Sequence, residues 1–340
     1  MSEKAILLAN LGSPDSYEVR DVKTYLNEFL MDERVIDIPW FFRFLLIRGI
    51  LVPLRAPKSA KNYQSIWTDN GSPLIHITAE LTKKVAAKTA LPTYMCMRYA
   101  SPTPQSALDK ALEENPDLKE MVLVPLYPHY AMSSYETAVL HVKKAHREGN
   151  YPFSLSVVKP YYNHPDYIRS LAASIAPYLE KDHDHLLFSY HGVPERHIRK
   201  SDITGKHCLK CDNCCQVESP AHRECYRHQV IKTTHLVAKQ LNIPEEKYSY
   251  SFQSRLGPDK WLEPFTADRF KKLPGEGIKK LLVVCPAFVS DCLETLEEIA
   301  GEGAEIFHEN SGESFEMIPC LNLRSDWVST IETLVKEYRE

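Results

Sequence analysis

Short apolar runs alternate along the chain with longer stretches in which apolar residues recur every three or four positions. The short runs have the length of buried strands, and the longer stretches have the period of helices with one buried face. The predicted strands are residues 5–9, 93–97, 120–125, 154–158, 185–189, 248–253 and 280–285. The predicted helices include residues 18–30, 76–90, 104–114, 133–147, 165–179, 222–240, 266–273, 292–301 and 325–338.

This alternation is typical of parallel sheets that are covered by helices on both faces. Seven strands over 340 residues fit an α/β protein with two Rossmann-like, doubly wound domains. The sequence has no internal repeat with a period of 20–50 residues. It has no glycine-rich dinucleotide fingerprint and no P-loop, so a nucleotide-binding enzyme has little support.

The segment 39–57, PWFFRFLLIRGILVPLRAP, is unusually apolar, with Arg43 and Arg48 inside its apolar part. It is too short to span a bilayer. One interpretation is a buried helix. The other is an apolar lip that meets a membrane surface or an apolar ligand, with its arginines at the level of the lipid headgroups. Arg55, near its end, is placed to face an anionic group.

Composition indicates an ordinary globular protein, with 44% hydrophobic and 25% charged residues. The net charge of −4 argues against a general nucleic-acid-binding protein, which would be basic. No stretch approaches the 18 or so uncharged apolar residues of a membrane span, and no secretory signal is recognisable. We therefore expect a cytoplasmic protein.

Five of the nine cysteines fall within residues 208–225. In a cytosolic protein such clustering favours metal binding over disulfides, and the spacing fits zinc as well as an iron–sulfur cluster. Unliganded thiols would be open to oxidation. The clustered residues are Cys208, Cys211, Cys214, Cys215 and Cys225, flanked by His207 and His222. The other four cysteines are expected to be small buried residues.

His191 follows the predicted strand 185–189 on a Gly–Val–Pro turn. Ligands of open α/β sheets bind at the carboxyl ends of the strands, so this histidine is well placed as a base or a metal ligand. The alternative is a histidine that only forms a hydrogen bond within the turn.

The segment 281–303 repeats this design, with a buried strand, a turn that contains proline and an acidic helix. Asp291, Glu294 and Glu298 stand at positions i, i+3 and i+7, which places them on one helix face as a row of carboxylates. The alternative is a structural role, because acidic residues in a first turn cap a helix and complement its dipole.

Other predicted strands also end in aromatic or basic residues. Arg98 and Tyr99 follow the strand 93–97, and Arg255 and Trp261 follow the strand 248–253. A large, flat, apolar ligand with a few anionic groups would suit such a lining.

Several stretches together resemble the ferrochelatase family, whose members insert ferrous iron into a porphyrin at the end of haem synthesis. They are LLANLGSPDS, FLMDERVIDIP, NYQSIWTDNGSPL, MRYASPTP, LYPHYAMSS, FSYHGVPERH, SFQSRLGPDKWLEP and CPAFVSDCLETLEEI. They occur in the family's order along nearly the whole chain, and the last three are highly specific.

The resemblance implies roles for individual residues. His191 matches the family's active-site histidine, Glu294 its glutamate and Glu298 the outer acid of the carboxylate row. His191 and Glu294 would also contact the Fe²⁺ substrate. Residues 39–52 match the apolar lip of membrane-associated members. The residues that match the porphyrin pocket are Arg55, Tyr63, Ser72, Arg98, Tyr99 and Trp261.

The resemblance also implies two Rossmann-like domains with the active site in the cleft between them. We expect the first in residues 1–126 plus 316–340, with the apolar lip at 39–57, and the second in residues 127–315. The expected reaction inserts Fe²⁺ into protoporphyrin IX, because the apolar lip favours a hydrophobic porphyrin. The alternatives are a chelatase for coproporphyrin or another tetrapyrrole, and an iron–sulfur or zinc redox sensor.

Some family members hold a 2Fe–2S cluster and others do not. Here the cysteines lie in an insertion at 202–226, as in a subset of bacterial members, so four of the five would be cluster ligands, with zinc as the alternative metal. The expected partners are a porphyrin and ferrous iron, and peripheral contact with the cytoplasmic face of the inner membrane is also expected. Nucleic acid is not an expected partner.

Overall fold

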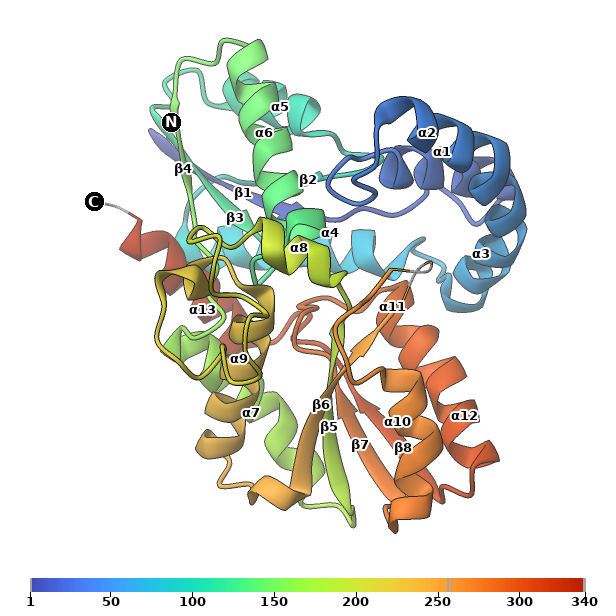
Figure 1. Cartoon of the computed structure of the whole chain (residues 1–340). Coiled ribbons are helices and arrows are strands. Elements are labelled where there is room, and N and C mark those ends of the chain that lie inside the picture. Colours follow the sequence, from blue (N-terminus) through green and yellow to red (C-terminus); the bar gives the residue numbers. More distant parts are fainter. Residues whose placement is uncertain (1, 256, 258, 339–340) are drawn as a thin grey trace. The chain divides into compact units, whose positions relative to one another are not determined.

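The structure is a computed structural model that describes residues 2–255, 257 and 259–338 (Figure 1). The chain folds as two compact units. Unit 1 comprises Met1–Leu126, Met132–Lys159 and Leu323–Glu340, as far as these residues are described, and unit 2 comprises Tyr127–Ala131 and Pro160–Asn322. These boundaries differ from the predicted ones at residues 132–159, which belong to unit 1, and at residues 316–322, which belong to unit 2. The reason is strand pairing: residues 154–157 pair with residues 120–123 in the sheet of unit 1, and residues 314–318 pair with residues 280–284 in the sheet of unit 2.

Unit 1 is built on a parallel sheet of four strands in the order β2-β1-β3-β4. The strands are β1 (Lys4–Asn10), β2 (Thr93–Met97), β3 (Glu120–Pro125) and β4 (Ser154–Val157). The helices that pack on it are α4 (Pro73–Thr89), α5 (Pro104–Glu114), α6 (Thr137–Glu148) and α13 (Ser325–Glu337). Helix α4 packs with α13, and α5 packs with α6, so two helical layers enclose the sheet, as right-handed crossovers require.

The apolar segment near the start of unit 1 forms helices rather than a strand. The elements are α1 (Val19–Leu30), α2 (Trp40–Leu46), the π-helical turn η1 (Ile47–Leu51) and α3 (Val52–Ile66), and α1 packs against α3 (Figure 1). The interpretation as a buried helix is wrong, because six large apolar side chains here are 51–74% exposed. They are Trp40, Phe41, Phe42, Leu45, Ile50 and Leu54.

The two arginines in the apolar part of this segment differ in their surroundings. Arg43 is buried, and its guanidinium donates to the carbonyl oxygens of Ile36 and Ile38 at 3.0 and 3.2 Å. Arg48 is exposed, and its guanidinium carbon lies 5.0 Å from the centre of the Phe44 ring. Only the Arg43 cation is therefore held inside the protein.

Unit 2 repeats the architecture with a parallel sheet in the order β6-β5-β7-β8. The strands are β5 (His185–His191), β6 (Tyr248–Gln253), β7 (Lys280–Val284) and β8 (Ser314–Ile318). Helices α7 (Pro165–Leu179) and α9 (Tyr226–Gln240) pack together on it, as do α10 (Thr266–Lys272) and α12 (Ala304–Glu309) (Figure 1). The predicted α/β class with two Rossmann-like domains is confirmed.

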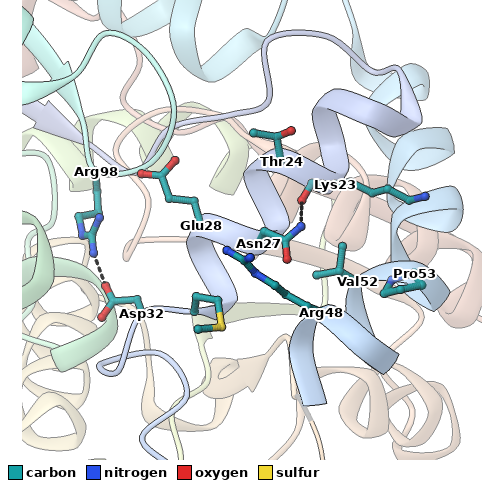
Figure 2. Close-up of a pocket in the computed structure, with 10 residues that line it drawn as sticks. Lys23, Thr24, Asn27, Glu28, Asp32, Arg48, Val52, Pro53 and Arg98 are labelled. Carbon is teal, nitrogen blue, oxygen red and sulfur yellow. Dashed lines mark hydrogen bonds and ion pairs between the residues drawn. The ribbon is translucent and has the colours of Figure 1, made fainter. Parts of the chain in front are cut away.

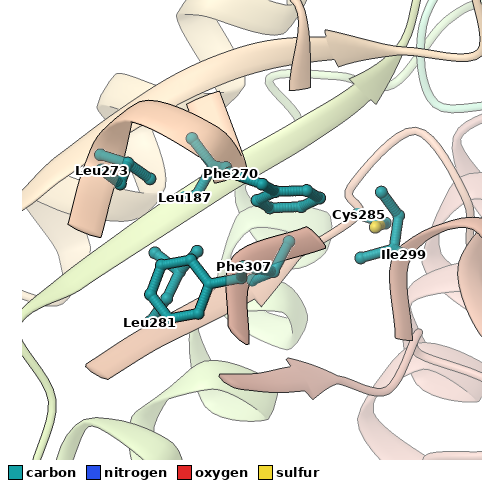
Figure 3. Packing of buried hydrophobic residues seen from close by; sticks show 8 residues of the cluster. Leu187, Phe270, Leu273, Leu281, Cys285, Ile299 and Phe307 are labelled. Atoms are coloured by element: carbon teal, nitrogen blue, oxygen red, sulfur yellow. The ribbon is translucent and has the colours of Figure 1, made fainter. Parts of the chain in front are cut away.

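The core of unit 2 fills the space between its sheet and the α10–α12 layer (Figure 3). Its buried members are Leu187, Phe270, Leu273, Leu281, Val283, Cys285, Ile299 and Phe307. Phe315 and Met317 of β8 pack against this core, whereas Glu316 between them pairs with Lys181 at 2.5 Å. Strand β8 was not predicted, because it is an edge strand whose apolar residues Phe315, Met317 and Ile318 are interrupted by Glu316.

The predicted helix 292–301 is broken into shorter pieces. Helix α11 spans only Leu293–Leu296, and the π-helical turn η6 (Glu298–Gly303) leads into α12. A Cβ at Gly303 would lie 2.7 Å from the ring of Phe270, so the backbone approaches this ring more closely than any side chain permits. The remaining helical elements are η2 (Met132–Glu136), α8 (Glu195–Lys200), η3 (Pro220–Arg223), η4 (Glu245–Lys247) and η5 (Leu273–Glu276).

Among the described residues, no helix combines the length and the apolar character that a membrane span requires.

Candidate active site

His191 is the last residue of β5, where strand register places it beside Gln253 of β6. Its Nδ1 lies 2.7 Å from the carbonyl oxygen of Gly192. A carbonyl only accepts, so Nδ1 carries the proton and Nε2 keeps its lone pair. Burial lowers the pKa of His191 against the opposing effect of the Glu294 charge, so the ring is neutral near pH 7. A neutral imidazole with a fixed tautomer is a competent base.

The turn after His191 is compatible only with glycine. A Cβ at Gly192 would lie 2.7 Å from the carbonyl oxygen of Gln253 and 3.2 Å from the Trp261 ring. Pro194 and Trp261 form an isolated β-bridge, which holds the indole against this turn. Trp261, predicted to line the porphyrin pocket, thus lies against Gly192, the residue that follows His191, and is 8% exposed.

Gln253 connects the histidine strand to Glu294. Its Oε1 accepts from the Ser189 hydroxyl of β5 at 2.7 Å, and its Nε2 donates to the backbone carbonyl of Glu294 at 3.0 Å. Glu294 lies in α11 and is partly exposed. The structure therefore brings the predicted His191 and Glu294 together through a buried amide, and the Glu294 charge acts on the His191 ring.

Glu298 is held by Ser254. The Ser254 backbone N–H donates to Oε1 at 2.7 Å, and its hydroxyl donates to Oε2 at 2.5 Å. Ser254 has a φ of 64°, a left-handed conformation that directs both donors at one carboxyl group. Burial raises the pKa of Glu298 to about 7, and the charge of Glu294 adds to this effect, while the Ser254 bonds oppose it.

Asp291, the first member of the predicted carboxylate row, has a different environment. It is buried, and its Oδ1 accepts from the Thr295 hydroxyl at 3.1 Å and from the Cys320 backbone N–H at 3.2 Å. Its bonds are to the protein itself, so the structural interpretation fits Asp291.

In unit 1, Asp32 organises two of the predicted porphyrin-pocket residues. It accepts from the Arg98 guanidinium at 2.6 Å, from the Tyr99 hydroxyl at 2.9 Å and from the Thr137 hydroxyl. Burial by itself would raise the pKa of Asp32. The hydrogen bonds from Thr137 and from the Arg34 backbone, together with the charge of Arg98, outweigh burial and lower this pKa below its usual value. Tyr99 is fully buried, so it supports Arg98 rather than lining a surface.

Arg98 and Asp32 line a cavity of about 730 Å³ in unit 1 (Figure 2). Helix α1 contributes Lys23 and Glu28, and η1 contributes Arg48, which points into the same space. The lining mixes three cations with two carboxylates.

The other predicted pocket residues of unit 1 lie on α3 and at the start of α4. Tyr63 is buried and meets Tyr25 edge-on, and Tyr25 also meets Tyr99, so Tyr63 and Tyr99 belong to one aromatic cluster. Ser72 is the buried N-cap residue of α4, and Arg55 is exposed on α3.

In the cysteine-rich insertion of unit 2, four of the five thiols are connected by their effects on one another's pKa. The thiols of Cys208 and Cys215 shift the pKa of Cys225, and the thiol of Cys214 shifts that of Cys215. Cys208, Cys214 and Cys225 are buried, whereas Cys211 is exposed. The Cys208 thiol contributes most to raising the pKa of Cys225 to about 12.

Polar groups hold this insertion in shape. Asp202 accepts from the backbone N–H groups of His207 and Cys208, both at 2.8 Å, and Arg227 donates to the Cys214 sulfur at 3.7 Å. His207 and His222 each contact the Cys214 carbonyl oxygen, at 2.7 and 3.0 Å. Across residues 2–255, 257 and 259–338, no three His, Cys, Asp or Glu side chains are grouped so as to hold a single metal ion.

Gln253, Ser254 and Asp32 are the site residues that the sequence analysis missed. Gln253 ends β6, in which serines alternate with aromatic residues, and a polar residue at a buried strand end is a signal that the sequence did contain. Asp32 gave no such signal, because the side chains that donate to it, those of Arg98, Tyr99 and Thr137, follow it by more than 60 residues.

Two four-stranded parallel sheets with flanking helices, of which the unit 2 sheet carries His191 at one strand end and Glu294 after another strand, define an α/β protein with two Rossmann-like units. The chain matches "SirB from Bacillus subtilis with Fe3+" with a TM-score of 0.55, 12% sequence identity and coverage of 99% of this chain and 96% of that one. It matches the cobalt complex of the sirohydrochlorin chelatase SirB from Bacillus subtilis subspecies spizizenii with a TM-score of 0.53 at 11% identity, over 99% and 95% of the two chains. At such identities the likeness shows the fold alone.

The sequence comparisons identify the family. The family model Ferrochelatase matches residues 3–339. The ferrochelatase of Ectopseudomonas mendocina is 46% identical over 336 residues, 98% of each chain, and that of Opitutus terrae is 45% identical over 341 residues, 99% of this chain and 98% of that one. The chain belongs to the ferrochelatase family, which confirms the resemblance seen in its motifs.

Proposed function

We propose that this chain is a ferrochelatase, a lyase that inserts Fe²⁺ into protoporphyrin IX to give protohaem. Full-length similarity to named ferrochelatases supports the reaction class. The observation that carries the mechanism is the state of His191, whose Nδ1 proton is bound to Gly192 and whose Nε2 lone pair is therefore available.

Each Fe²⁺ that enters a porphyrin replaces two pyrrole protons, so two protons must leave the ring in each turnover. Neutral His191 accepts one of them at Nε2. Glu298, with a pKa of about 7, exchanges protons near neutral pH. Glu294 supplies a carboxylate next to His191 that attracts Fe²⁺, and these two residues form the proposed iron site, which the iron leaves for the ring before His191 Nε2 takes up the proton.

The remaining predicted residues hold the macrocycle in this proposal. Arg98, which lines the cavity of unit 1, and Arg55, which is exposed, are the cations for its carboxylates, and Trp261 supplies an aromatic face. Tyr63, Ser72 and Tyr99 are buried and act by supporting this surface. Coproporphyrin is the alternative substrate, and steady-state assays with each porphyrin and Fe²⁺ distinguish the two.

The test of the mechanism is His191→Ala. The variant should lose iron insertion while a fluorescence titration shows that porphyrin still binds. The matched control is His308→Ala, because His308 also points Nδ1 at a carbonyl oxygen, that of Gly312 at 3.0 Å, but is exposed on α12. An active His191→Ala variant would exclude the proposed role.

We further propose that the insertion binds a 2Fe–2S cluster, with zinc as the alternative metal. The four connected thiols of Cys208, Cys214, Cys215 and Cys225 match the four thiolates that such a cluster needs. When bound, the cluster would link the insertion covalently to the start of α9. Cys211, being exposed and outside the connected set, is the residue that we leave out of the ligand set.

Metal and sulfide analysis tests this assignment directly. The purified protein should contain two irons and two sulfides, with visible charge-transfer absorption. Cys211→Ser should keep that absorption, and Cys208→Ser should lose it. A colourless protein that contains stoichiometric zinc would show that the insertion binds zinc and not a 2Fe–2S cluster. Loss of the absorption in Cys211→Ser would refute the proposed set of four cysteine ligands.

We also propose that the exposed apolar surface of α2, η1 and α3 makes peripheral contact with a membrane. Its support is the clustering of six exposed apolar side chains within fifteen residues, which a protein surface in water does not favour.

A further inference from the structure

Asn322 ends unit 2 in a left-handed turn just after β8. Its φ is 44°, a conformation that asparagine tolerates better than most residues, and its backbone N–H donates to the carbonyl oxygen of Val289 at 2.8 Å. The turn therefore brings this side chain back to the segment that leads from β7 to α11.

The Asn322 amide binds Asp291 at two points. Its Oδ1 accepts from the Asp291 backbone N–H at 2.8 Å, and its Nδ2 donates to Asp291 Oδ2 at 2.6 Å. The other oxygen of Asp291 accepts from Thr295 and from the Cys320 backbone. This buried carboxylate thus has partners on both oxygens, and Asn322 supplies the shortest of its bonds.

These bonds end on the residues that flank Glu294. Asp291 precedes Glu294 by three positions, and Thr295 follows it directly. The Thr295 hydroxyl also accepts from the Cys292 backbone N–H at 3.0 Å, which completes a capping box at the start of α11. Because α11 has only four residues, its own hydrogen bonds cannot fix its direction, and the side-chain bonds at its start must do so.

We propose that Asn322 is a positioning residue for iron insertion, which acts through Asp291 to fix the helix start that carries Glu294. This inference rests on the proposed function. Gln253 holds the Glu294 carbonyl from the β6 side, and Asn322 holds the opposite end of the same short helix. Displacement of a reacting group by about 1 Å can lower a rate by about 100-fold, so a residue without substrate contact can still limit kcat.

The amide is suited to this task because it donates and accepts at once while remaining neutral. An aspartate at 322 would keep the acceptor for the Asp291 N–H but place a second carboxylate against Asp291. The thiols of Cys285 and Cys320 also face Asp291, and burial raises their pKa values well above the usual range, so both stay neutral. The charge of Glu298 also acts on the Cys285 thiol, and that of Glu294 acts on the Cys292 thiol, so these two are the neighbouring acids.

The experiment compares Asn322→Gly with Asn242→Gly in the full-length protein. Glycine adopts the left-handed backbone of both positions, so each variant loses only a side chain. Asn242 has a φ of 53° at the end of α9, away from the site residues. We expect kcat for iron insertion to fall about 10- to 100-fold in Asn322→Gly, with the porphyrin KM changed less than about twofold, and to stay at the wild-type value in Asn242→Gly.

A second variant separates positioning from general loss of structure. In Asn322→Asp the two adjacent carboxylates cannot both be charged, so one takes up a proton as the pH falls and the missing donor returns. Its kcat relative to the wild type should therefore rise towards low pH, whereas Asn322→Gly should show no such recovery.

Two results would overturn the inference. One is a wild-type kcat in Asn322→Gly, and the other is a loss of kcat that only follows the fraction of unfolded protein measured by circular dichroism. A wild-type protein that inserts no iron would instead refute the proposed function, so the two failures are distinguishable.

Discussion

At the scale of single residues, burial acts in opposite directions on the pKa values of His191 and Glu298. It lowers the pKa of the histidine and raises that of the carboxyl group to about 7, because in both cases it favours the uncharged form. One group is thereby kept free of its proton and the other is kept near half-protonation at neutral pH. This difference suits a site that takes protons from a substrate and passes them on.

The raised pKa of Glu298 predicts how stability depends on pH. Folded Glu298 keeps its proton up to about pH 7, whereas in the unfolded chain it loses the proton near 4.5. The folded state therefore binds more protons between these values, and Glu298 makes the wild type less stable as the pH rises from 5 to 7. Glu298→Gln removes this dependence, so its stability relative to the wild type should increase by about 1–3 kcal/mol over that range.

Urea unfolding at pH 5, 6 and 7 measures this difference. Glu305→Gln is the control, because Glu305 is an exposed acid on the neighbouring helix α12. If the curves for Glu298→Gln and the wild type run parallel across these pH values, Glu298 does not hold a proton as proposed.

The same residue-level physics explains which site residues could be predicted from the sequence and which could not. His191 and Glu294 were predictable because both follow buried strands, and parallel strands end at one edge of a sheet. The roles of Gln253, Ser254 and Asn322 were not, because each depends on a hydrogen bond to a residue at least 31 positions away or on a left-handed φ. Sequence periodicity carries neither kind of information.

At the scale of elements, the strands with two buried faces were predicted almost to the residue, since continuous apolar runs leave little ambiguity. The half-exposed β8 was missed, and the expected helix 292–301 proved to be the four-residue helix α11 followed by the π-helical turn η6. The close contact of Gly303 with Phe270, which no local pattern reveals, accompanies that break. Segment 39–57 was ambiguous because an apolar helix has the same pattern whether its face meets a core or a membrane.

The exposed surface of α2 predicts membrane binding that depends on its apolar side chains. Replacing Phe41 and Phe42 together by serine removes two side chains that are each worth about 1.5–3 kcal/mol when fully buried in an apolar medium. We expect sedimentation with phospholipid vesicles to weaken by at least about tenfold, and by a similar factor at low and high salt because the replaced side chains carry no charge.

Leu140→Ser is the control for that experiment, because Leu140 is an exposed apolar residue on α6, 39% accessible and outside the lip. Equal vesicle binding by the double variant and the wild type would exclude the lip as the contact surface.

At the scale of the whole molecule, unit 1 depends on a helix from the far end of the chain. Helix α13 packs on α4 and buries Trp327 completely. Trp327→Ala should therefore lower the free energy of unfolding by about 3–5 kcal/mol. Trp40→Ala, which removes an indole that is 61% exposed, should change it by less than about 0.5 kcal/mol.

Urea denaturation followed by far-ultraviolet circular dichroism compares the two tryptophan variants. A similar loss of stability in both would mean that α13 contributes little to unit 1.

The late position of α13 also has a consequence for biosynthesis. A ribosome makes α4 early and α13 last, with all of residues 160–322 in between. At roughly 5–20 residues per second, that delay is on the order of ten seconds or more. Throughout this time the nascent α4 lacks the helix that covers it, so the first unit to be translated is the last to be completed. Chaperone binding to the emerging chain should therefore concentrate on α4 rather than on unit 2.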